Sequence, residues 1–395
     1  MSYNIPEFIL YSCLQDYNIC GAFKTEKTFL KTASFYPEPT NWLSKIFGWF
    51  IILISTFELE FMLAFVMRPN QNLTKISETF LFSMTQIAFL SKLFNFILKK
   101  GNMALIERAL REATFAAASA IEINVMERYA TKNRIVAKVY RTLCMGCVLL
   151  YGIFPMIDAR GNENKKIYPL PGLFPFDPDN YYVVVYLVEI TSIAIGAWMN
   201  STIDILFIIL ATVGTAQFAI LGDRIRAVTS GTNYRDGLVE RRLKRCVAHH
   251  HELLKLVDLI ENTFSNGIFV QFFCSVVVIC LTGFQMIVIS LRSTQFLSLV
   301  VYFSTMMCQL IIYCWYGQLL MDKSNEITRA CYEVVWNETD LATQKLLLII
   351  MERAKKVSAL RAARFFTLKL STLMMILRSS YSYFAVLQRL YTKNY

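Results

Sequence analysis

The chain has 395 residues, of which 55% are hydrophobic and 17% are charged, and its mean hydropathy is +0.42. Soluble domains carry about 25% charged residues, so the composition excludes an ordinary soluble protein. The formal net charge of +11 would suit a nucleic-acid-binding protein. The basic residues lie mainly in the connections between apolar segments, however, and we expect no nucleic-acid partner.

The N-terminal segment, residues 1–45, is expected to remain on the cytoplasmic side of a membrane. Residues 5–23 form an amphipathic stretch, which is typical of a segment that lies on a membrane surface. The first twenty residues have no basic start and include Glu7 and Asp16, so no signal peptide is expected.

Seven apolar stretches follow, and each is long enough to cross a bilayer, which takes about 20 predominantly apolar residues. The sequence therefore predicts an all-α membrane protein with seven spans. The stretches are residues 46–66, 77–98, 139–157, 183–221, 264–291, 296–320 and 367–391.

Basic residues set the orientation of these spans. With a cytoplasmic N-terminus, the inner segments hold 28 Lys or Arg residues and the outer loops hold 6. Cytoplasmic loops are enriched in Lys and Arg, so we expect a cytoplasmic N-terminus, an extracellular C-terminus and contact of the basic residues with the lipid bilayer. This orientation is the reverse of a G-protein-coupled receptor.

The connections between spans differ on the two sides. Three inner connections, residues 101–138, 237–262 and 321–356, have helical patterns and together predict a helical cytoplasmic bundle. On the outer side, residues 158–182 contain four prolines and predict an ordered lid. Asn72 begins a glycosylation sequon in the first outer loop, where modification would report the topology.

The residue types that carry catalysis or bind metals do not form a site in this sequence. His249, His250 and His251 point in different directions on a helix, so they cannot share one metal. Cys144 and Cys147 have C-x-x-C spacing inside an apolar stretch and are interpreted as buried thiols. Without a phosphate-loop, nucleophile-elbow or zinc-protease motif, we expect neither an enzyme nor a cofactor.

Three acidic residues lie within the predicted spans, Glu58 and Glu60 in the first and Asp204 in the fourth. Ionisable side chains inside a bilayer are costly and are candidates for function. Helix packing is the favoured role for the two glutamates. For Asp204 two roles stay open, pairing with a base from the cytoplasmic side and hydrogen bonding to a neighbouring helix.

The last span has a polar side and an apolar side. At about 100° per residue, the opposite, apolar side holds Leu373, Ile376, Leu377, Phe384 and Leu387. The polar stripe consists of Ser371, Met375, Arg378, Ser382, Val386 and Arg389. A helix that faces only lipid needs no such stripe. Two interpretations stay open, hydrogen bonding between helices and a water-filled pore at the axis of an oligomer.

The last fifth of the chain carries an ordered series of short motifs. They are Tyr-Cys-Trp-Tyr-Gly-Gln at 313–318, Lys-Leu-Leu-Leu-Ile-Ile-Met-Glu-Arg-Ala at 345–354, Phe-Thr-Leu-Lys-Leu-Ser-Thr-Leu at 366–373 and Ser-Tyr-Ser-Tyr-Phe-Ala-Val-Leu at 380–387. In this order and spacing they resemble the C-terminal signature of insect odorant receptors. The rest of the chain matches that family in architecture, and the last motif favours the odorant branch over the gustatory one.

The resemblance implies a subunit of an odorant-gated, non-selective cation channel in the plasma membrane of olfactory sensory neurons. Such subunits assemble with an obligate co-receptor into a heterotetramer whose seventh helices surround the pore. This chain lacks the co-receptor's large insertion before the fifth span, so it resembles a tuning subunit. The match implies spans one to six with the odorant pocket at 46–320, anchor helices at 321–366 and the pore helix at 367–395.

The same match assigns roles to individual residues. Val386 would form the hydrophobic gate, Ser382 would face the wet side, and Gln388 and Arg389 would lie near the outer mouth. The subunit anchor would contain Trp315, Tyr316, Tyr332 and Trp336.

In the family the odorant lies among the outer halves of spans two to six. The corresponding residues here are apolar, aromatic or sulfur-containing, with few hydroxyls and no charge, which predicts a small neutral volatile ligand. They are Phe80, Ser83, Met84, Cys147, Tyr151, Ile193, Ala197, Tyr302, Phe303 and Met306. For each of them, plain packing between helices is the alternative role.

Two residues depart from the family pattern, and three alternative functions fit the sequence less well. Val357 and Ala363 stand where the family often has proline and glycine, so the turn into the last span lacks its usual helix breakers. A homomeric odorant- or tastant-gated channel is disfavoured because four copies of Arg389 would repel cations. A metabotropic seven-helix receptor conflicts with the distribution of basic residues, and a transporter would be expected to show broken helices or inverted repeats.

Overall fold

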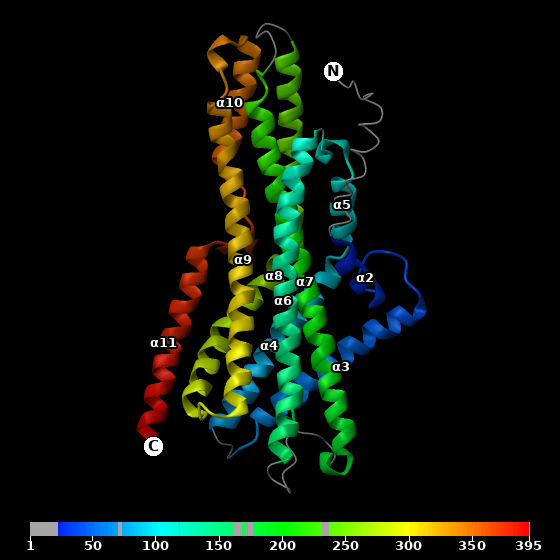
Figure 1. Cartoon of the computed structure of the whole chain (residues 1–395), viewed down its shortest axis with the longest axis vertical. Helices are drawn as coiled ribbons and strands as arrows, with labels where there is room; N and C mark the ends of the chain where they lie inside the picture. The colour runs from blue at the N-terminus through cyan, green and yellow to red at the C-terminus, as the bar shows by residue number, and fades with distance from the viewer. Residues whose placement is uncertain are drawn as a thin grey trace, which may run out of the picture.

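Long helices that run side by side make up almost all of the computed structural model (Figure 1). The structure describes residues 23–69, 73–117, 119–160, 168–170, 172, 177–230 and 237–394. The elements are α2 (Lys24–Thr32), α3 (Trp42–Val66), α4 (Leu73–Leu98), α5 (Gly101–Leu110), η2 (Ala113–Phe115), α6 (Ala120–Arg160), η3 (Pro178–Tyr181), α7 (Tyr182–Arg226), α8 (Leu238–Val288), α9 (Thr294–Tyr332), η4 (Trp336–Glu338), α10 (Leu341–Lys355), β1 (Arg361–Ala362), β2 (Phe366–Thr367) and α11 (Leu370–Asn394). The predicted all-α fold is confirmed, with one short hairpin that the sequence did not predict. Most of the predicted amphipathic stretch at 5–23, the Asn72 sequon and most of the predicted lid lie outside the described residues.

Among the described residues, six helices are long and apolar enough to cross a membrane, namely α3, α4, α6, α7, α8 and α9. They contain the first six predicted spans, except that α8 ends at Val288, before the predicted end of the fifth span at residue 291. The seventh, α11, has 25 residues, and its serines, tyrosines and arginines make it the most polar of the seven. It begins at Leu370 rather than at Thr367, because residues 366–367 pair in the hairpin.

The central helix of the fold is α7. It packs against α2, α3, α4, α6, α8 and α9, and 94% of its most apolar segment is buried inside the chain. By contrast, only 17% of the corresponding segment of α3 is buried. A helix that is apolar on all sides must be surrounded by protein or lipid, so α7 forms the core and α3 lies at the lipid boundary.

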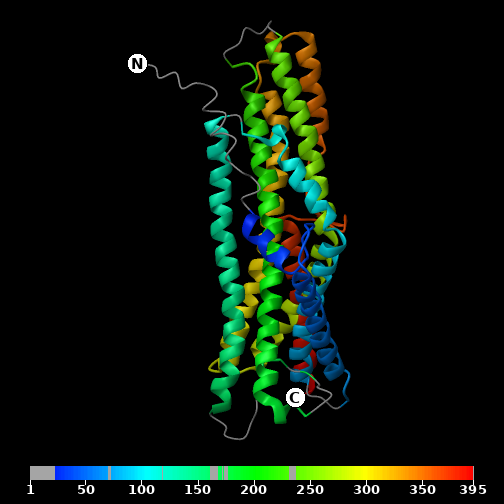
Figure 2. The same ribbon diagram turned by 90° about the vertical axis from the view of Figure 1, so that its right-hand side faces the viewer.

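Three helices are much longer than a bilayer is thick. With 41, 45 and 51 residues, α6, α7 and α8 extend roughly 60 to 75 Å, about twice the 30 Å hydrocarbon core. The ends of α7 and α8 project on one side, where they lie in a bundle with α9 and α10 (Figure 2), and α6 packs against α7 and α9. The predicted inner segments are therefore continuous with the spans over residues 120–138, 237–262 and 321–332, whereas α5 and α10 are separate helices.

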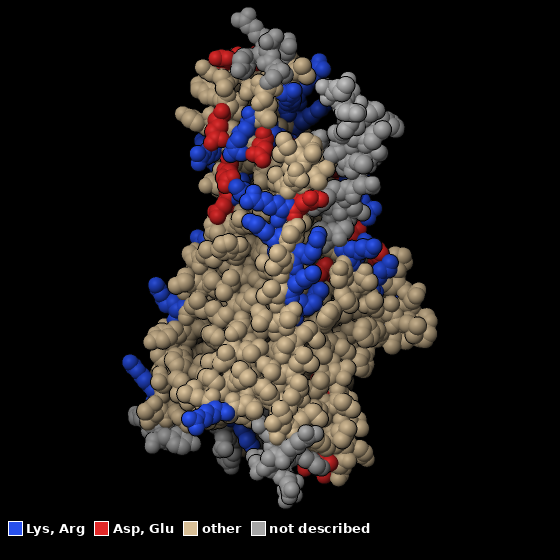
Figure 3. All heavy atoms as spheres, in the orientation of Figure 1, with Lys and Arg blue, Asp and Glu red and all other residues tan. Residues whose placement is uncertain are grey.

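Charged side chains are unevenly distributed along this axis. On the face in Figure 3, they crowd the end of the molecule that carries α10 and are sparse over a broad band below it. The band lies at the level of the apolar segments of the helices, as expected for the part of the surface that contacts lipid tails.

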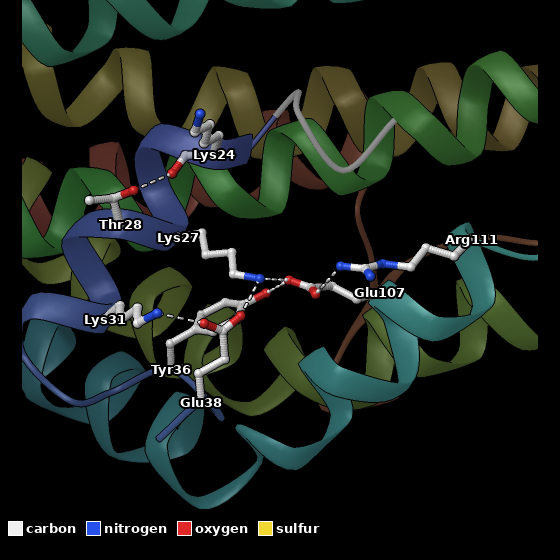
Figure 4. A network of polar contacts seen from close by, with 8 residues as sticks. All are labelled: Lys24, Lys27, Thr28, Lys31, Tyr36, Glu38, Glu107 and Arg111. Atoms are coloured by element: carbon white, nitrogen blue, oxygen red, sulfur yellow. Dashed lines mark hydrogen bonds and ion pairs between the residues drawn. The ribbon is translucent and has the colours of Figure 1, made fainter. Parts of the chain in front are cut away.

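Charged residues also tie α2 to the loop after it and to α5 (Figure 4). Lys27 pairs with Glu38 and with Glu107, at 2.8 Å from Glu107 Oε1, and Tyr36 donates a hydrogen bond to the same oxygen. Lys31 pairs with Glu38 at 2.9 Å. The hydrogen bonds from Lys27 and Lys31 lower the pKa of Glu38. These contacts hold α2 against the bundle just before the chain enters its first span.

At the α10 end, outside the apolar band, His249 is buried between α8 and α7. Arg224 lies 3.3 Å from His249 Nδ1, and because arginine only donates, this nitrogen accepts. The Nε2–H group therefore donates to Gln217 Oε1 at 3.0 Å. Arg224 also donates hydrogen bonds to both carboxylate oxygens of Glu122, at 2.7 and 2.9 Å. Both ring nitrogens of His249 are occupied within the chain, so this histidine has a structural role.

The hairpin of β1 and β2 connects α10 to α11. Its turn holds Ala363 at φ 47° and Arg364 at φ 63°, in the left-handed region that costs a residue with a Cβ roughly 1–2 kcal/mol. The Ala363 N–H donates to the carbonyl of Ser265 at 3.3 Å, which fixes the turn to α8. The turn thus forms without glycine at position 363, and α10 ends at Lys355 without a proline at 357.

Replacing Ala363 with glycine should stabilise the fold by about 0.5–1 kcal/mol, because glycine adopts a positive φ without steric cost. The melting temperature of the purified protein in detergent measures this change. Ala362→Gly is the matched control, since Ala362 is buried in β1 and its φ is not positive, and it should lower the melting temperature. An Ala363→Gly protein that melts below the wild type would contradict the prediction.

The buried histidines should make stability depend on pH. Burial and Arg224 lower the pKa of His249 to about 3, and burial and Arg353 lower that of His250 to about 4. The unfolded chain, with a histidine pKa near 6.5, takes up protons first as the pH falls. The free energy of unfolding is therefore highest above pH 6.5 and falls below it. The loss is about 1.4 kcal/mol per histidine between pH 7.5 and 5.5.

Melting curves at pH 7.5 and 5.5 test this dependence. His249→Gln should remove about half of the difference, while the exposed His251→Gln should leave it unchanged. Equal melting temperatures of the wild type at the two pH values would contradict the expected burial of neutral imidazoles.

Candidate functional site

Asp204, in the middle of α7, is the centre of a buried polar network that joins four helices. Its Oδ1 is 2.9 Å from Nζ of Lys92 on α4, and its Oδ2 accepts a hydrogen bond from Tyr140 on α6 at 2.8 Å. Gln309 and Tyr313 on α9 donate to Oδ2 and Oδ1 respectively. Both charged side chains are only 2% exposed. The two roles left open for Asp204, an ion pair and hydrogen bonds to neighbouring helices, are thus both present.

Helix α8 packs closely against α4 at Lys92. A Cβ atom at Gly267 would lie 3.0 Å from the Cα of Lys92, so a larger residue at this position would push the two helices apart. Lys92 Nζ also lies 6.0 Å from the centroid of the Tyr313 ring. An isolated charge at this depth is very costly, so the ion pair fixes α4 relative to α7.

A cavity of about 140 Å³ lies beside the network, among α3, α4, α6, α7 and α9. Tyr140 belongs to both, because it lines the cavity and donates to Asp204. Phe82, Phe89 and Met306 supply part of the apolar wall. Drug-sized ligands occupy clefts of about 300–1,000 Å³, so this cavity suits a smaller molecule.

Six of the ten residues predicted to bind ligand line this cavity, namely Cys147, Tyr151, Ile193, Ala197, Tyr302 and Met306. The other four do not. Ser83 is buried and donates to the carbonyl of Thr79. Phe80 and Met84 pack against the small apolar cluster beside the cavity, and Phe303 packs against the main core. The cavity-facing residues of α4 are instead Phe82, Thr85, Gln86 and Phe89.

Sequence reasoning also missed polar residues in the cavity wall. Glu58 of α3 and Ser192 and Asn200 of α7 line the cavity together with Gln86. The expectation that no charged side chain lies near the ligand is therefore not met. Glu58 carried a signal, since it is an ionisable residue inside a span, but the sequence did not indicate which way it faces.

Part of the predicted lid reaches this cavity. Leu170 lines it, and the Leu170 N–H is 3.5 Å from the carboxylate of Glu189, which is buried on α7. Near the start of α7, Tyr168 donates to Asp179 at 2.8 Å. The described part of the 158–182 connection thus packs against the helices and covers one side of the cavity.

The two sides of α11 have different surroundings. Leu373, Ile376 and Ser380 are buried against the rest of the chain, where α11 packs on α8 and α9. The stripe identified in the sequence lies on the opposite, exposed side. Its members Ser371, Met375, Arg378, Ser382, Val386 and Arg389 are all exposed, as is Gln388.

The residues assigned to the subunit anchor fall into two groups. Trp315, Tyr332 and Trp336 are 54%, 72% and 50% exposed, and α10 also carries exposed apolar side chains such as Leu348. Tyr316 is buried inside the chain. It therefore supports this surface from within and does not form part of it.

Two contacts connect the cavity region to α11. A Cβ atom at Gly317 of α9 would lie 2.4 Å from Leu368, just before α11, so the two segments approach as closely as glycine allows. Farther along α11, Leu387 packs against the cluster that contains Tyr302 and Met306 of the cavity wall. Both contacts join α11, or the segment just before it, to the rest of the chain.

Comparisons with known proteins agree on one family. The family model described as "7tm Odorant receptor" matches residues 72–381. "Odorant receptor 85b" of Drosophila melanogaster is 31% identical over 256 residues, which cover 64% of each chain, and "Odorant receptor 85c" is 23% identical over 78% of this chain and 80% of its own. The solved insect olfactory receptor OR5 from Machilis hrabei, in complex with eugenol, has a TM-score of 0.81 at 15% identity, covering 96% of this chain and 99% of its own. At that identity the likeness is one of fold.

Breaking the buried ion pair should destabilise the protein strongly. Lys92→Met leaves Asp204 as an unpaired buried charge, so we expect a loss of about 3–5 kcal/mol in the free energy of unfolding. Changing Asp204 to asparagine as well should recover much of this loss. The exposed pair Lys355–Glu352 is the control, because Lys355→Met should change stability by less than about 0.5 kcal/mol. Melting temperatures that rank the single variant no lower than the double variant would contradict the account.

Proposed function

Because the chain belongs to the family of seven-helix odorant receptors, we propose that it is the odorant-binding subunit of a ligand-gated, non-selective cation channel. The observation that supports channel activity most directly is the exposed polar face of α11. The requirement for a co-receptor and the location in the plasma membrane of olfactory sensory neurons are parts of the same proposal.

The proposed orientation follows from charge. The bundle at the α10 end carries most of the basic residues. By the positive-inside rule, this end lies on the cytoplasmic side. The C-terminal end of α11, at the opposite end of the molecule (Figure 1), is then extracellular. Residues 1–45 would form the cytoplasmic N-terminal segment, 46–320 the first six spans with the odorant cavity, 321–366 the anchor and 367–395 the pore helix.

The exposed face of α11 needs a polar or wet environment. Arg378, Ser382 and Arg389 all lie on it, and lipid tails offer no partner for such side chains. One helix cannot enclose a pore, but four α11 helices around an axis can, with these faces turned inward. Val386, which is 57% exposed on the same face, would then form a hydrophobic constriction that closes by dewetting.

Arg378 and Arg389 also support a mixed assembly. Four copies of this chain would place rings of positive charge along the pore, and such rings oppose the passage of cations. A heterotetramer with co-receptor subunits dilutes that charge. Exposed aromatic side chains at Trp315, and about 25 Å farther along at Tyr332 and Trp336, offer apolar contacts through which subunits can associate.

The contacts of α11 suggest how ligand binding opens the gate. An odorant in the cavity touches Tyr302 and Met306, and the cluster that contains them packs against Leu387. Leu387 is the chain neighbour of Val386. A ligand that fits better when α11 has moved outward shifts the population toward the open state.

Whole-cell current in a heterologous cell tests the proposal, with a panel of small neutral volatiles applied to cells that express this chain with or without the co-receptor. We expect a rapid cation current only when both are present. Current from this chain alone would show a homomeric channel. Absence of current from both, with surface expression verified, would contradict channel activity.

Val386→Ala should increase the current in the absence of odorant, because a less apolar constriction dewets less readily. The increase in basal current relative to the maximal evoked current is the quantity to measure. Val183→Ala is the control, since Val183 is 66% exposed at the start of α7, far from the pore helix in the sequence and not on it. Equal basal currents in the two variants would remove Val386 from the gate.

A further inference from the structure

Three oxygen atoms in the wall of the cavity have no hydrogen-bond partner among the described residues. They are Glu58 Oε1, Ser192 Oγ and Asn200 Oδ1, and all three are buried. Ser192 as a whole is only 2% exposed. Buried polar atoms are nearly always hydrogen-bonded, and each one left alone has a substantial energetic cost. The cavity therefore gathers unsatisfied polar atoms where a ligand can reach them.

Neighbouring side chains do not satisfy Glu58. Gln86 Nε2 donates to the carbonyl of Ser55 at 3.1 Å and lies 3.5 Å from the other carboxylate oxygen, Oε2. The Ser192 hydroxyl, which lines the same cavity, also has no hydrogen-bond partner of ordinary geometry among the described residues. Glu189 adds a second carboxyl group within electrostatic range and already accepts from the Leu170 N–H. This side of the cavity thus offers two carboxyl groups to a ligand.

Several donors in the cavity wall are committed elsewhere. Tyr140 donates to Asp204, and Thr305 donates to the carbonyl of Val301 at 2.8 Å. The hydroxyls of Tyr302 and Thr85 bond each other. Since these groups already have partners, a donor carried by the molecule that fills the cavity would give the free oxygen of Glu58 a hydrogen bond.

We propose that the ligand carries a hydrogen-bond donor, either a hydroxyl or an ammonium group, at one end of a small apolar body. Glu58, with Ser192 and Asn200, binds this end, and the wall around Phe82 and Met306 packs against the apolar body. The inference rests on the proposed function, since it takes this cavity as the odorant site. A hydroxyl group agrees with the neutral volatile ligand expected from the sequence. An ammonium group would make the ligand a cation instead.

Four probes with the same number of heavy atoms separate these chemistries. They are hexanol and hexylamine, which carry donors, and hexanal and methoxypentane, which carry only acceptors. Applied to cells that express the chain with its co-receptor, at least one donor compound should be about tenfold or more potent than both acceptor compounds, because hydrogen bonds to charged groups are strong. Equal potency of hexanol and methoxypentane, together with equal potency of hexylamine and hexanal, would overturn the proposal.

Variants of Glu58 identify the donor. Glu58→Gln keeps an acceptor oxygen but removes the charge, so it should abolish a preference for hexylamine and spare one for hexanol. Glu58→Leu should abolish both preferences. Glu60→Gln is the matched control, because Glu60 is exposed on the same helix and does not line the cavity. A Glu58→Leu receptor that keeps the wild-type order of potency would contradict the role of Glu58.

Thermal stabilisation of the purified receptor separates this inference from channel activity. A ligand raises the melting temperature according to its affinity, whether or not a pore opens. One outcome is that hexanol or hexylamine stabilises the receptor, Glu58→Leu abolishes the effect, and cells show no current. This outcome would support the ligand class and contradict the channel. Current evoked equally by all four probes would support the channel and contradict the ligand class. No stabilisation by either donor compound at its solubility limit, in a receptor that folds, would also contradict it.

Discussion

The rest of the structure depends on the ion pair between Asp204 and Lys92. It lies where α4, α6, α7 and α9 meet, and its carboxylate accepts four hydrogen bonds or ionic contacts from the three other helices. Apolar packing in lipid gives little directional force between helices, whereas a buried charge has only one acceptable arrangement. The pair therefore fixes the relative positions of α4, α6, α7 and α9, which line the cavity, and α11 packs on α8 and α9.

This arrangement places the proposed ligand site and the contacts to the proposed pore helix on the same helix. Along α9, Tyr302 and Met306 line the cavity, Tyr313 binds Asp204, and Gly317 touches the segment just before α11. A rigid helix transmits a displacement at one end to its contacts farther along. The network fixes α9 near Tyr313, whereas Tyr302 and Met306 lie in the stretch of α9 whose cluster packs against Leu387.

The sequence predicted the number and type of the helices because a span must be apolar over about 20 residues, and such stretches are visible without a structure. It also singled out Asp204 and Glu58 as ionisable residues inside spans. It did not predict their partners. In the sequence, Lys92 is only a basic residue inside a predicted span. The cavity-facing side of α4, with Phe82 and Phe89, has no distinct pattern because most of α4 is apolar.

Local features without a sequence signal were missed as well. The left-handed turn at Ala363 and Arg364 has no glycine to mark it, so the hairpin before α11 could not be expected from propensity. The burial of Tyr316 beside the exposed Trp315 depends on how α9 is rotated, which only packing decides. By contrast, the two sides of α11 were predicted correctly, because a polar stripe at helical spacing is itself the signal.

The measurement that tests the central claim most directly is the accessibility of the exposed face of α11 to water. Cysteines replace Ser382 on that face and Leu373 on the buried face, and a cationic, water-soluble thiol reagent is applied during odorant-evoked current. The account predicts that modification changes the current through the Ser382→Cys channel and leaves the Leu373→Cys channel like the unsubstituted one. Equal insensitivity of both would contradict a water-filled pore lined by α11.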